Sequence, residues 1–315
     1  MVYVHKITLI HSFTFTQWYM FTRFLIFFQL PSIFGIFHFD RGFSLYFMAI
    51  LPEGEVPPTP GTKESEKYLW NFKGLTLELT HNHGSEKDDK FEVNNGNVEP
   101  YRGFGHLAVM TKDVYATSAE LEANGVAFKK RPDEGRMKGL AFCLDPDGYW
   151  IEIIKRAEDS PINMKYTLAQ TMLRVKDPEK SVKFYREMFG MTLLRSSDMS
   201  DFSLYFLADN HVDPGNNMGQ IFEPVLELTH NHGTESDPDF SYHNGNDQDK
   251  GQVRGFGHIG FCCDNLDAAC AYLEEKGAKF KKKPHEGAMR GLAFVYDPDG
   301  YWVEVIDRNF ASINE

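Results

Sequence analysis

The sequence predicts an α+β fold in which a module of one strand, one helix and three further strands occurs four times. Two internal matches and one pattern support this. Gly103-Phe104-Gly105-His106 returns as Gly255-Phe256-Gly257-His258, a shift of 258 − 106 = 152 residues. The run Asp-Pro-Asp-Gly-Tyr-Trp at 145–150 returns at the same shift, at 297–302. Within each copy, strand-like and helix-like segments alternate, as in folds that mix sheet and helix.

The second copy opens with a strand and a helix. Residues 166–175 predict the strand, and Asp177 is a suitable N-cap for a helix that begins at Pro178. Apolar residues at helical spacing continue to Phe189, and Gly190 is expected to end the helix. Three strands are expected to follow, at 192–195, 202–208 and 225–230. Together these elements make one module.

The same order of elements then repeats. A stretch rich in Gly, Asn and Asp at 233–252 predicts a loop. Beyond it we expect a strand at 257–263, a helix at 266–276, a stop at Gly277, and strands at 278–282, 291–296 and 301–306. The copy therefore holds two modules, and the whole chain holds four.

The first copy matches the second from Phe43 onward. Its loop before the Leu-Glu-Leu-Thr strand is longer by (77 − 43) − (226 − 202) = 10 residues, and Pro57, Pro58 and Pro60 mark the insertion as loop. We expect a divergent segment at 1–42, a first copy at 43–156 with a poorly recognisable N-terminal part, a linker at 157–163, and a second copy at 164–308.

The N-terminal segment has an unusual composition. Residues 1–39 contain no acidic residue and are rich in Phe. The uncharged run from Phe24 to Phe39 is 16 residues long and contains Pro31, so it is short for a membrane span, and the basic flank of a signal peptide is missing. Two interpretations stay open, an organelle-targeting presequence and a wrongly translated exon.

Charge and cysteine content exclude several classes of protein. The chain has 33 basic and 45 acidic residues, a net charge of −12, and no basic tract. This argues against a nucleic acid or an anionic membrane as partner. The four cysteines have no C-x-x-C spacing, so we expect reduced thiols in a cytoplasmic protein rather than disulfides or a cysteine zinc site.

Each copy carries a Glu, a His and a second Glu in strand-like runs. The residues are Glu78, His106 and Glu152 in the first copy and Glu227, His258 and Glu304 in the second. Side chains alternate along a strand, so Glu78 lies opposite Leu77 and Leu79. One such Glu alone is more often solvated, and one such His is more often a core residue. The recurrence of all three favours a metal site, because buried carboxylates and imidazoles need a partner.

Longer motifs carry a family resemblance. These are Gln-Thr-Met-Leu-Arg-Val-Lys-Asp-Pro at 170–178, and the repeated Leu-Glu-Leu-Thr-His-Asn, Arg-Gly-Phe-Gly-His and Asp-Pro-Asp-Gly-Tyr-Trp-(Ile/Val)-Glu. Over roughly 43–306 the chain resembles the glyoxalase I (lactoylglutathione lyase) family in its two-copy, single-chain form. The resemblance implies the vicinal oxygen chelate fold, in which the βαβββ modules form two paired cup-shaped sheets around divalent metal ions.

The resemblance also implies that each metal site draws ligands from both copies. For the first site these are Gln170, Glu227, His106 and Glu152; for the mirror site they are Glu78, His258, Glu304 and, from the borrowed spacing, His11. Such ligands suit Zn²⁺, with Ni²⁺ or Co²⁺ as alternatives. The paired residues His81, His83, His230 and His232 are interpreted as solvated strand ends.

Glutathione contacts follow from the same resemblance. For the first site they are Arg174, Asn231, Arg102, Lys130, Arg136 and Met137; for the mirror site they are Asn82, Arg254, Lys282 and Met289. Cationic side chains suit the two carboxylates of glutathione. In the mirror site Ala288 stands for Arg136 and Phe15 for Arg174, so two expectations stay open there: weaker glutathione binding or, if the N-terminal strand does not form, an inactive site.

The implied activity is isomerisation of the methylglyoxal–glutathione hemithioacetal to S-lactoylglutathione through an enediolate, with glutathione as co-substrate. The resemblance makes Glu152 the general base, Glu304 its equivalent, and Glu227 the carboxylate that returns the proton. Two alternatives are an enzyme resembling extradiol dioxygenases, which use two His and one carboxylate on ferrous iron, and a non-catalytic module that binds glutathione conjugates or thiols. The expected partner is a small molecule, and the expected state is a monomer.

Overall fold

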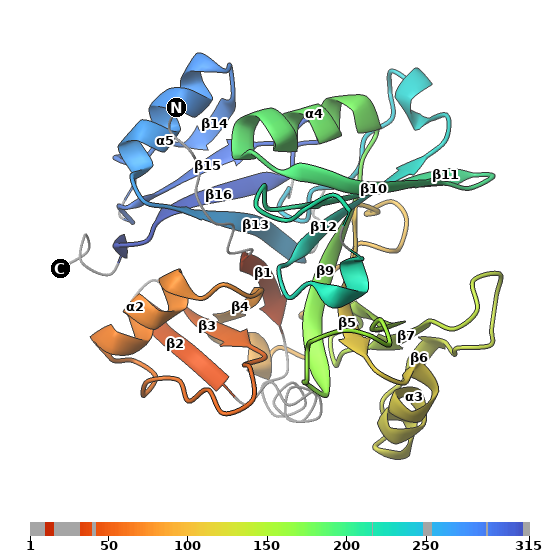
Figure 1. The fold of residues 1–315 in the computed structure, drawn as a ribbon. Coiled ribbons are helices and arrows are strands. Elements are labelled where there is room, and N and C mark those ends of the chain that lie inside the picture. The colour runs from red at the N-terminus through yellow and green to blue at the C-terminus, as the bar shows by residue number, and fades with distance from the viewer. Residues whose placement is uncertain are drawn as a thin grey trace.

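The computed structural model describes residues 10–15, 32–39, 42–215, 217–247, 254–287 and 289–310, the first two ranges as backbone only. Two eight-stranded sheets dominate the fold (Figure 1). Sheet I contains β1 (Ile10–Phe15), β2 (Ser32–Phe39), β3 (Phe43–Ala49), β4 (Thr76–Asn82), β13 (Phe256–Cys263), β14 (Lys279–Lys282), β15 (Leu292–Tyr296) and β16 (Trp302–Asp307). Sheet II contains β5 (Phe104–Thr111), β6 (Phe128–Lys130), β7 (Ala141–Leu144), β8 (Trp150–Lys155), β9 (Tyr166–Arg174), β10 (Thr192–Asp198), β11 (Phe202–Ala208) and β12 (Val225–Asn231).

The two copies are crossed between the sheets. Sheet I has the order β14-β15-β16-β13-β1-β4-β3-β2, and sheet II has the order β10-β11-β12-β9-β5-β8-β7-β6. Each sheet therefore joins one module of the first copy to one module of the second. The predicted fold of paired sheets is confirmed, whereas the domain boundaries at 43–156 and 164–308 stay a prediction.

The described helices follow the first strand of their module, as expected, except the one at residues 63–71. They are α2 (Lys63–Asn71), α3 (Val114–Ala123), α4 (Pro178–Phe189) and α5 (Leu266–Glu275), with 3₁₀ turns η1 (Ser85–Lys87), η2 (Met218–Gln220) and η3 (Thr234–Ser236). The predicted ends of α4 are confirmed. The Asp177 carboxylate accepts a hydrogen bond from the Lys180 backbone N–H, and Gly190 follows the helix at φ 71°.

The divergent N-terminal segment contributes two strands to sheet I. β1 pairs antiparallel with β13 and parallel with β4, as β9 in sheet II pairs antiparallel with β5 and parallel with β12. The sequence had not identified these strands, because the apolar composition of 1–42 lacks the motifs of the second copy. His11 and Phe15 lie on β1, but their side chains lie outside the described residues.

The ten-residue insertion of the first copy leads into a helix that sequence analysis did not identify. Its proline-rich part is coil and turn, as predicted, but α2 begins directly after it. The Thr62 side chain and the Ser65 side chain cap each other's backbone N–H groups at the start of α2. The last turn buries Leu69 and Trp70. In the second copy, the short turn η2 lies at this point of the module.

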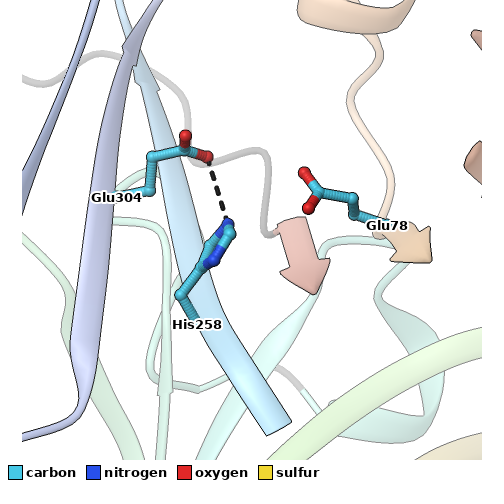
Figure 2. A group of neighbouring side chains, drawn as sticks. All are labelled: Glu78, His258 and Glu304. Carbon is cyan, nitrogen blue, oxygen red and sulfur yellow. Dashed lines mark ion pairs between the residues drawn. The ribbon is translucent and has the colours of Figure 1, made fainter. Parts of the chain in front are cut away.

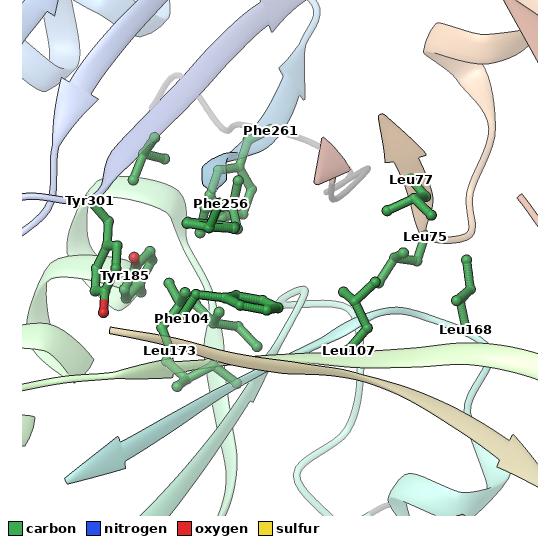
Figure 3. Packing of buried hydrophobic residues seen from close by; sticks show 14 of the residues in the cluster. Leu75, Leu77, Phe104, Leu107, Leu168, Leu173, Tyr185, Phe256, Phe261 and Tyr301 are labelled. Atoms are coloured by element: carbon green, nitrogen blue, oxygen red, sulfur yellow. The ribbon is translucent and has the colours of Figure 1, made fainter. Parts of the chain in front are cut away.

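A hydrophobic core joins the two sheets. It includes Leu77 and Leu79 of β4, Phe104 of β5 and Phe256 of β13. Figure 3 shows Phe104 close to Phe256 within this cluster, and Leu77 beside Leu75. The expected alternation in β4 is therefore confirmed, with the leucines in the core and Glu78 on the opposite face. Full burial of one such side chain contributes roughly 1.5–3 kcal/mol to folding. The faces turned away from this core carry the candidate sites.

Candidate active site

Four strands at the centre of sheet II bring the residues of the first site together. In the register of the sheet, Ala108 of β5 lies opposite both Gln170 of β9 and Glu152 of β8. Met172 of β9 lies opposite Glu227 of β12 on one side and opposite His106 of β5 on the other. Alternation along each strand then turns the four polar side chains to one face.

The four side chains are within contact distance of one another. The Gln170 amide nitrogen donates to Glu152 Oε2 at 3.1 Å and to Glu227 Oε2 at 2.6 Å. The His106 Nε2 atom lies 3.3 Å from Glu152 Oε2 and 3.6 Å from Glu227 Oε2. All four residues are buried. The structure thus brings together the predicted residues of both copies; their role as ligands stays a prediction.

Two carboxylates beside one imidazole set the electrostatics of the first site. Burial disfavours the charged imidazole, but the carboxylates of Glu152 and Glu227 outweigh it and raise the pKa of His106 from 6.5 to about 9. In the absence of any other cation, the imidazolium therefore balances one of the two buried negative charges. The second negative charge is left without a neutralising group among these residues.

The donor set fits a divalent cation. His106 Nε2 is buried and, among the described residues, makes no hydrogen bond of acceptable geometry. The same atom and the carboxylates of Glu152 and Glu227 all lie within 4.8 Å of one another. Gln170 adds an amide whose carbonyl oxygen is a further possible ligand. One imidazole nitrogen with hard oxygen donors is a set that zinc and its neighbours accept.

The mirror site has the same arrangement on sheet I. Glu78 of β4, His258 of β13 and Glu304 of β16 point toward one another from three strands, with β1 between β4 and β13 (Figure 2). His258 Nε2 lies 3.4 Å from Glu304 Oε2 and, like His106 Nε2, has no hydrogen-bond partner among the described residues. Burial opposes charging of His258, yet Glu304 and Glu78 raise its pKa. The predicted fourth residue, His11, lies outside the residues with described side chains.

A cavity of about 350 Å³ opens over the first site. His106, Glu152, Gln170 and Glu227 all line it. Of the six predicted glutathione contacts, four line the same cavity: Arg102, Met137, Arg174 and Asn231. The cavity therefore combines a cluster of possible metal ligands with cationic and amide groups suited to an anionic substrate.

The other two predicted contacts, Lys130 and Arg136, do not line this cavity. The Lys130 ammonium donates to the Leu140 backbone carbonyl at 2.5 Å, and Leu140 itself lines the cavity. The Arg136 guanidinium instead donates to both carboxylate oxygens of Asp201, at 2.9 and 3.1 Å. Binding glutathione through Arg136 thus requires this ion pair to open.

Arg174 is held by backbone groups of the first copy. Its Nη1 donates to the carbonyls of Gly96, Gly103 and Phe104 at 3.1, 3.3 and 3.0 Å, and its Nη2 donates to Asn97 Oδ1 at 2.8 Å. Burial lowers the pKa of this guanidinium. Arg174 therefore joins the second copy to the segment that leads into β5 and His106.

The predicted contacts of the mirror site are more dispersed. Met289 lines a small cavity beside Glu78 and Glu304, and Asn82 ends β4. The Lys282 ammonium donates to the Leu292 carbonyl at 2.8 Å, which repeats the arrangement of Lys130. Arg254 is exposed. Ala288 lies outside the described residues.

Sequence analysis missed the apolar walls of the cavity. Phe202, Leu204 and Phe206 of β11 line one side, and Phe142 and Trp150 line the other. The signal was present, because residues 202, 204 and 206 alternate along one strand and so share a face. These walls limit the access of water to the four polar side chains.

One interpretation of the histidines needs correction. His230 is not a solvated strand end but a buried residue, and its Nε2 lies 2.7 Å from Glu235 Oε2. His81 and Glu86 form the same pair in the first copy, at 2.9 Å. The nearby His83 and His232 contact Ser44 and Ser203. None of these four belongs to either cluster of possible metal ligands.

Two further expectations concern the chain as a whole. Cys143, Cys262, Cys263 and Cys270 are free and buried, as predicted. Within the described ranges, none of the helices combines the length and the apolar character that a membrane crossing needs.

Comparison with known proteins gives consistent matches. The model of the Glyoxalase/Bleomycin resistance protein/Dioxygenase superfamily matches residues 72–153 and 167–305. "Glyoxalase I" of Saccharomyces cerevisiae is 44% identical over 276 residues, 85% of this chain and 81% of that protein. "Lactoylglutathione lyase" of Schizosaccharomyces pombe is 43% identical over 273 residues, 85% of each chain. The crystal structure of glyoxalase I from Zea mays superposes with a TM-score of 0.69 at 24% identity, covering 98% of this chain and 94% of that one, which shows a shared fold.

Proposed function

The chain belongs to the Glyoxalase/Bleomycin resistance protein/Dioxygenase superfamily, and we propose that it is a lactoylglutathione lyase, the activity for which its two yeast relatives are named. It converts the hemithioacetal of methylglyoxal and glutathione into S-lactoylglutathione. One proton moves between adjacent carbon atoms through an enediolate, and the substrate loses no electrons. A single chain is proposed to be sufficient for this activity, because each site already draws residues from both copies of the repeat.

The observation that carries the proposal is the crossed first site. Gln170 and Glu227 of the second copy lie within contact distance of Glu152 of the first, at the base of a cavity whose walls are apolar. Glu152 and Glu227 both lie close to His106 Nε2. Two carboxylates on one small cavity suit a proton transfer between neighbouring carbons, one to remove the proton and one to return it.

We propose that His106, Glu152, Gln170 and Glu227 hold a zinc ion. When bound, such an ion supplies Lewis-acid stabilisation of negative charge on the two neighbouring oxygens of the substrate. Among the residues with described side chains, each cluster has two carboxylates and one imidazole, whereas the ferrous site of an extradiol dioxygenase has two imidazoles and one carboxylate. The ligand set thus favours isomerisation over oxygen chemistry.

Glu152 is the proposed general base. Its side chain is buried and lines the cavity beside apolar residues, and its Oε2 lies 3.3 Å from His106 Nε2, within reach of a substrate held there. Glu227 comes from the other copy and is the proposed group that returns the proton. Gln170 donates to both carboxylates and so keeps them apart in fixed positions.

Arg102, Arg174 and Asn231 are proposed to bind the glutathione part of the substrate, with Lys130, Arg136 and Met137 near the rim. Arg102 and Arg174 give the cavity positive charge in a chain whose net charge is −12. A guanidinium can grip a carboxylate through two parallel hydrogen bonds. The four free cysteines suit a reducing compartment, and we place the enzyme in the cytoplasm.

A direct experiment measures metal content and glutathione-dependent turnover on the same purified chain. We expect bound zinc and formation of the thiolester from methylglyoxal and glutathione, lost on treatment with a chelator and restored by the metal. Nickel and cobalt are tested in the same reconstitution. Thiolester formation that is unaffected by complete metal removal would contradict the proposal, and so would binding of glutathione conjugates without turnover.

A further inference from the structure

The mirror site keeps its cluster of possible metal ligands, but the cavity that its described residues line is far smaller than that of the first site. The cavity beside Glu78 and Glu304 measures about 20 Å³, against about 350 Å³ for the cavity of the first site. A volume of 20 Å³ holds about one water molecule. It does not hold a glutathione adduct.

Two aromatic residues fill the missing space. Trp70 of α2 is 2% exposed and packs edge-on against Phe47 of β3, with ring centroids 5.4 Å apart, and against Phe310 after β16, at 5.6 Å. All three rings line the remaining small cavity together with Glu78 and Glu304. The aromatic group therefore lies where a substrate would have to enter.

Among the described residues, the first site has no counterpart of the Trp70 or Phe310 ring. Leu45 and Phe47 of β3 correspond to Leu204 and Phe206 of β11, which line the open cavity, so the strand walls are the same in both sites. Phe310 corresponds to Glu158, since 310 − 152 = 158. At the place of α2 the second copy has only the short turn η2, which offers Met218.

The aromatic group is anchored on two sides. The capping box at Thr62 and Ser65 fixes the start of α2. At its end, Arg308 Nη1 donates to the Trp70 backbone carbonyl at 2.7 Å, and Arg308 Nε lies 3.1 Å from Asp264. Arg308 thus links Trp70 to the segment after β16 that carries Phe310. The two rings are therefore held beside the mirror site by contacts of the folded chain.

We propose that the mirror site binds a divalent cation but no substrate, because Trp70 and Phe310 occupy the substrate position. This inference rests on the proposed function of the first site. The cation would join β4 of the first copy to β13 and β16 of the second. Trp70 and Phe310 are then the residues that restrict the enzyme to one working site.

The test is a pair of binding stoichiometries on the unmodified chain. We expect two Zn²⁺ per chain by metal titration, and one S-hexylglutathione, a non-reactive thioether of glutathione, by calorimetry. Two thioethers per chain would overturn the inference and leave the proposed function intact. A single Zn²⁺ would also overturn it. If neither Zn²⁺ nor thioether binds, the proposed function itself fails.

Variants that remove the two aromatic rings provide a complementary test of thioether binding. We expect Trp70→Ala with Phe310→Glu to bind a second thioether, weaker than the first by roughly 10- to 100-fold, because the counterparts of Arg136 and Arg174 are Ala288 and Phe15. Phe310→Glu alone serves if the double variant does not fold. Trp70→Phe keeps a large ring and should still bind one thioether. If the double variant folds, or Phe310→Glu alone in its place, and still binds only one thioether, that result contradicts the proposal.

Discussion

Phe104 of β5 and Phe256 of β13 stack face to face at the centre of the molecule, with ring centroids 4.9 Å apart and ring planes 10° apart. They are equivalent residues of the repeat, so the two copies meet here at the same position of each. Tyr149 contacts the first ring edge-on and Tyr301 contacts the second, both at 6.1 Å. Each Phe precedes the imidazole of its own site by two residues, so this stack fixes the distance between the two sites.

Removing either ring should destabilise the whole chain. Both side chains are about 1% exposed, so Phe104→Ala and Phe256→Ala each leave a cavity between the sheets. We expect each to lower the free energy of unfolding by about 3–5 kcal/mol, as measured by urea denaturation. Val98→Ala, at a residue that is 60% exposed, is the control and should cost less than about 0.5 kcal/mol. Losses that differ strongly between the two Phe variants would argue against their equivalence.

The two proposed bases should differ in importance. Glu152→Gln removes the base of the open first site, and we expect thiolester formation to fall by on the order of 10²- to 10⁴-fold. Glu304→Gln changes the equivalent residue of the closed mirror site and should leave turnover almost unchanged. The comparison is matched, since both residues are buried Glu side chains of equivalent strands. Equal losses in the two variants would refute the asymmetry.

The two clusters of possible metal ligands were predictable from sequence, and the aromatic packing beside the mirror site was not. Glu152 and Glu227 sit in short strands whose alternation fixes their face, and the family resemblance supplied the crossed pairing of the copies. Trp70 lies in an insertion with no counterpart in the other copy, so the repeat carried no information about it. The capping pair at Thr62 and Ser65 was the available local signal. Which cavity an isolated aromatic residue fills depends on tertiary packing.

Arg174 should affect both substrate binding and stability. Its guanidinium donates to three backbone carbonyls and to Asn97, and an ammonium group cannot reproduce that fork. We expect Arg174→Lys to raise KM and to lower the free energy of unfolding by about 1.5–3 kcal/mol. Arg102→Lys, at a more exposed cavity residue, is the control for charge alone and should change KM with little effect on unfolding.

The ion pair between Arg136 and Asp201 should hinder binding of the substrate. The two side chains are 71% and 61% exposed, so solvent screens the pair and it adds little to the stability of the fold. Asp201→Asn frees the guanidinium, and we expect a lower KM for the hemithioacetal at unchanged unfolding midpoint. Arg136→Ala should raise KM. The effect of Asp201→Asn should shrink at high salt, which screens the same pair. An unchanged KM at low salt would show that Arg136 does not contact the substrate.

Metal binding should release protons at neutral pH. Without a metal, the carboxylates of Glu152 and Glu227 raise the pKa of His106 to about 9, so the imidazole is charged at pH 7.5. A metal-bound imidazole is neutral, so zinc must displace this proton. Calorimetry in buffers of different ionisation enthalpy should give close to one proton for the first site at pH 7.5, falling toward none above pH 9. His258, whose pKa is also raised, should add its own proton when a second ion binds.

The raised pKa of His106 also makes the stability of the metal-free chain depend on pH. A histidine with a raised pKa stabilises the fold fully below pH 6.5, its ordinary value, and this contribution is lost as the pH rises through about 9. The metal-free chain should therefore become less stable between these values, whereas the zinc-loaded chain should not show this loss, because the cation replaces the proton between the two carboxylates. His106→Gln, which cannot carry the charge, should remove the pH dependence of the metal-free chain in this window. If zinc binds at pH 7.5 without proton release, His106 is already neutral, and the two carboxylates do not govern it as the geometry indicates.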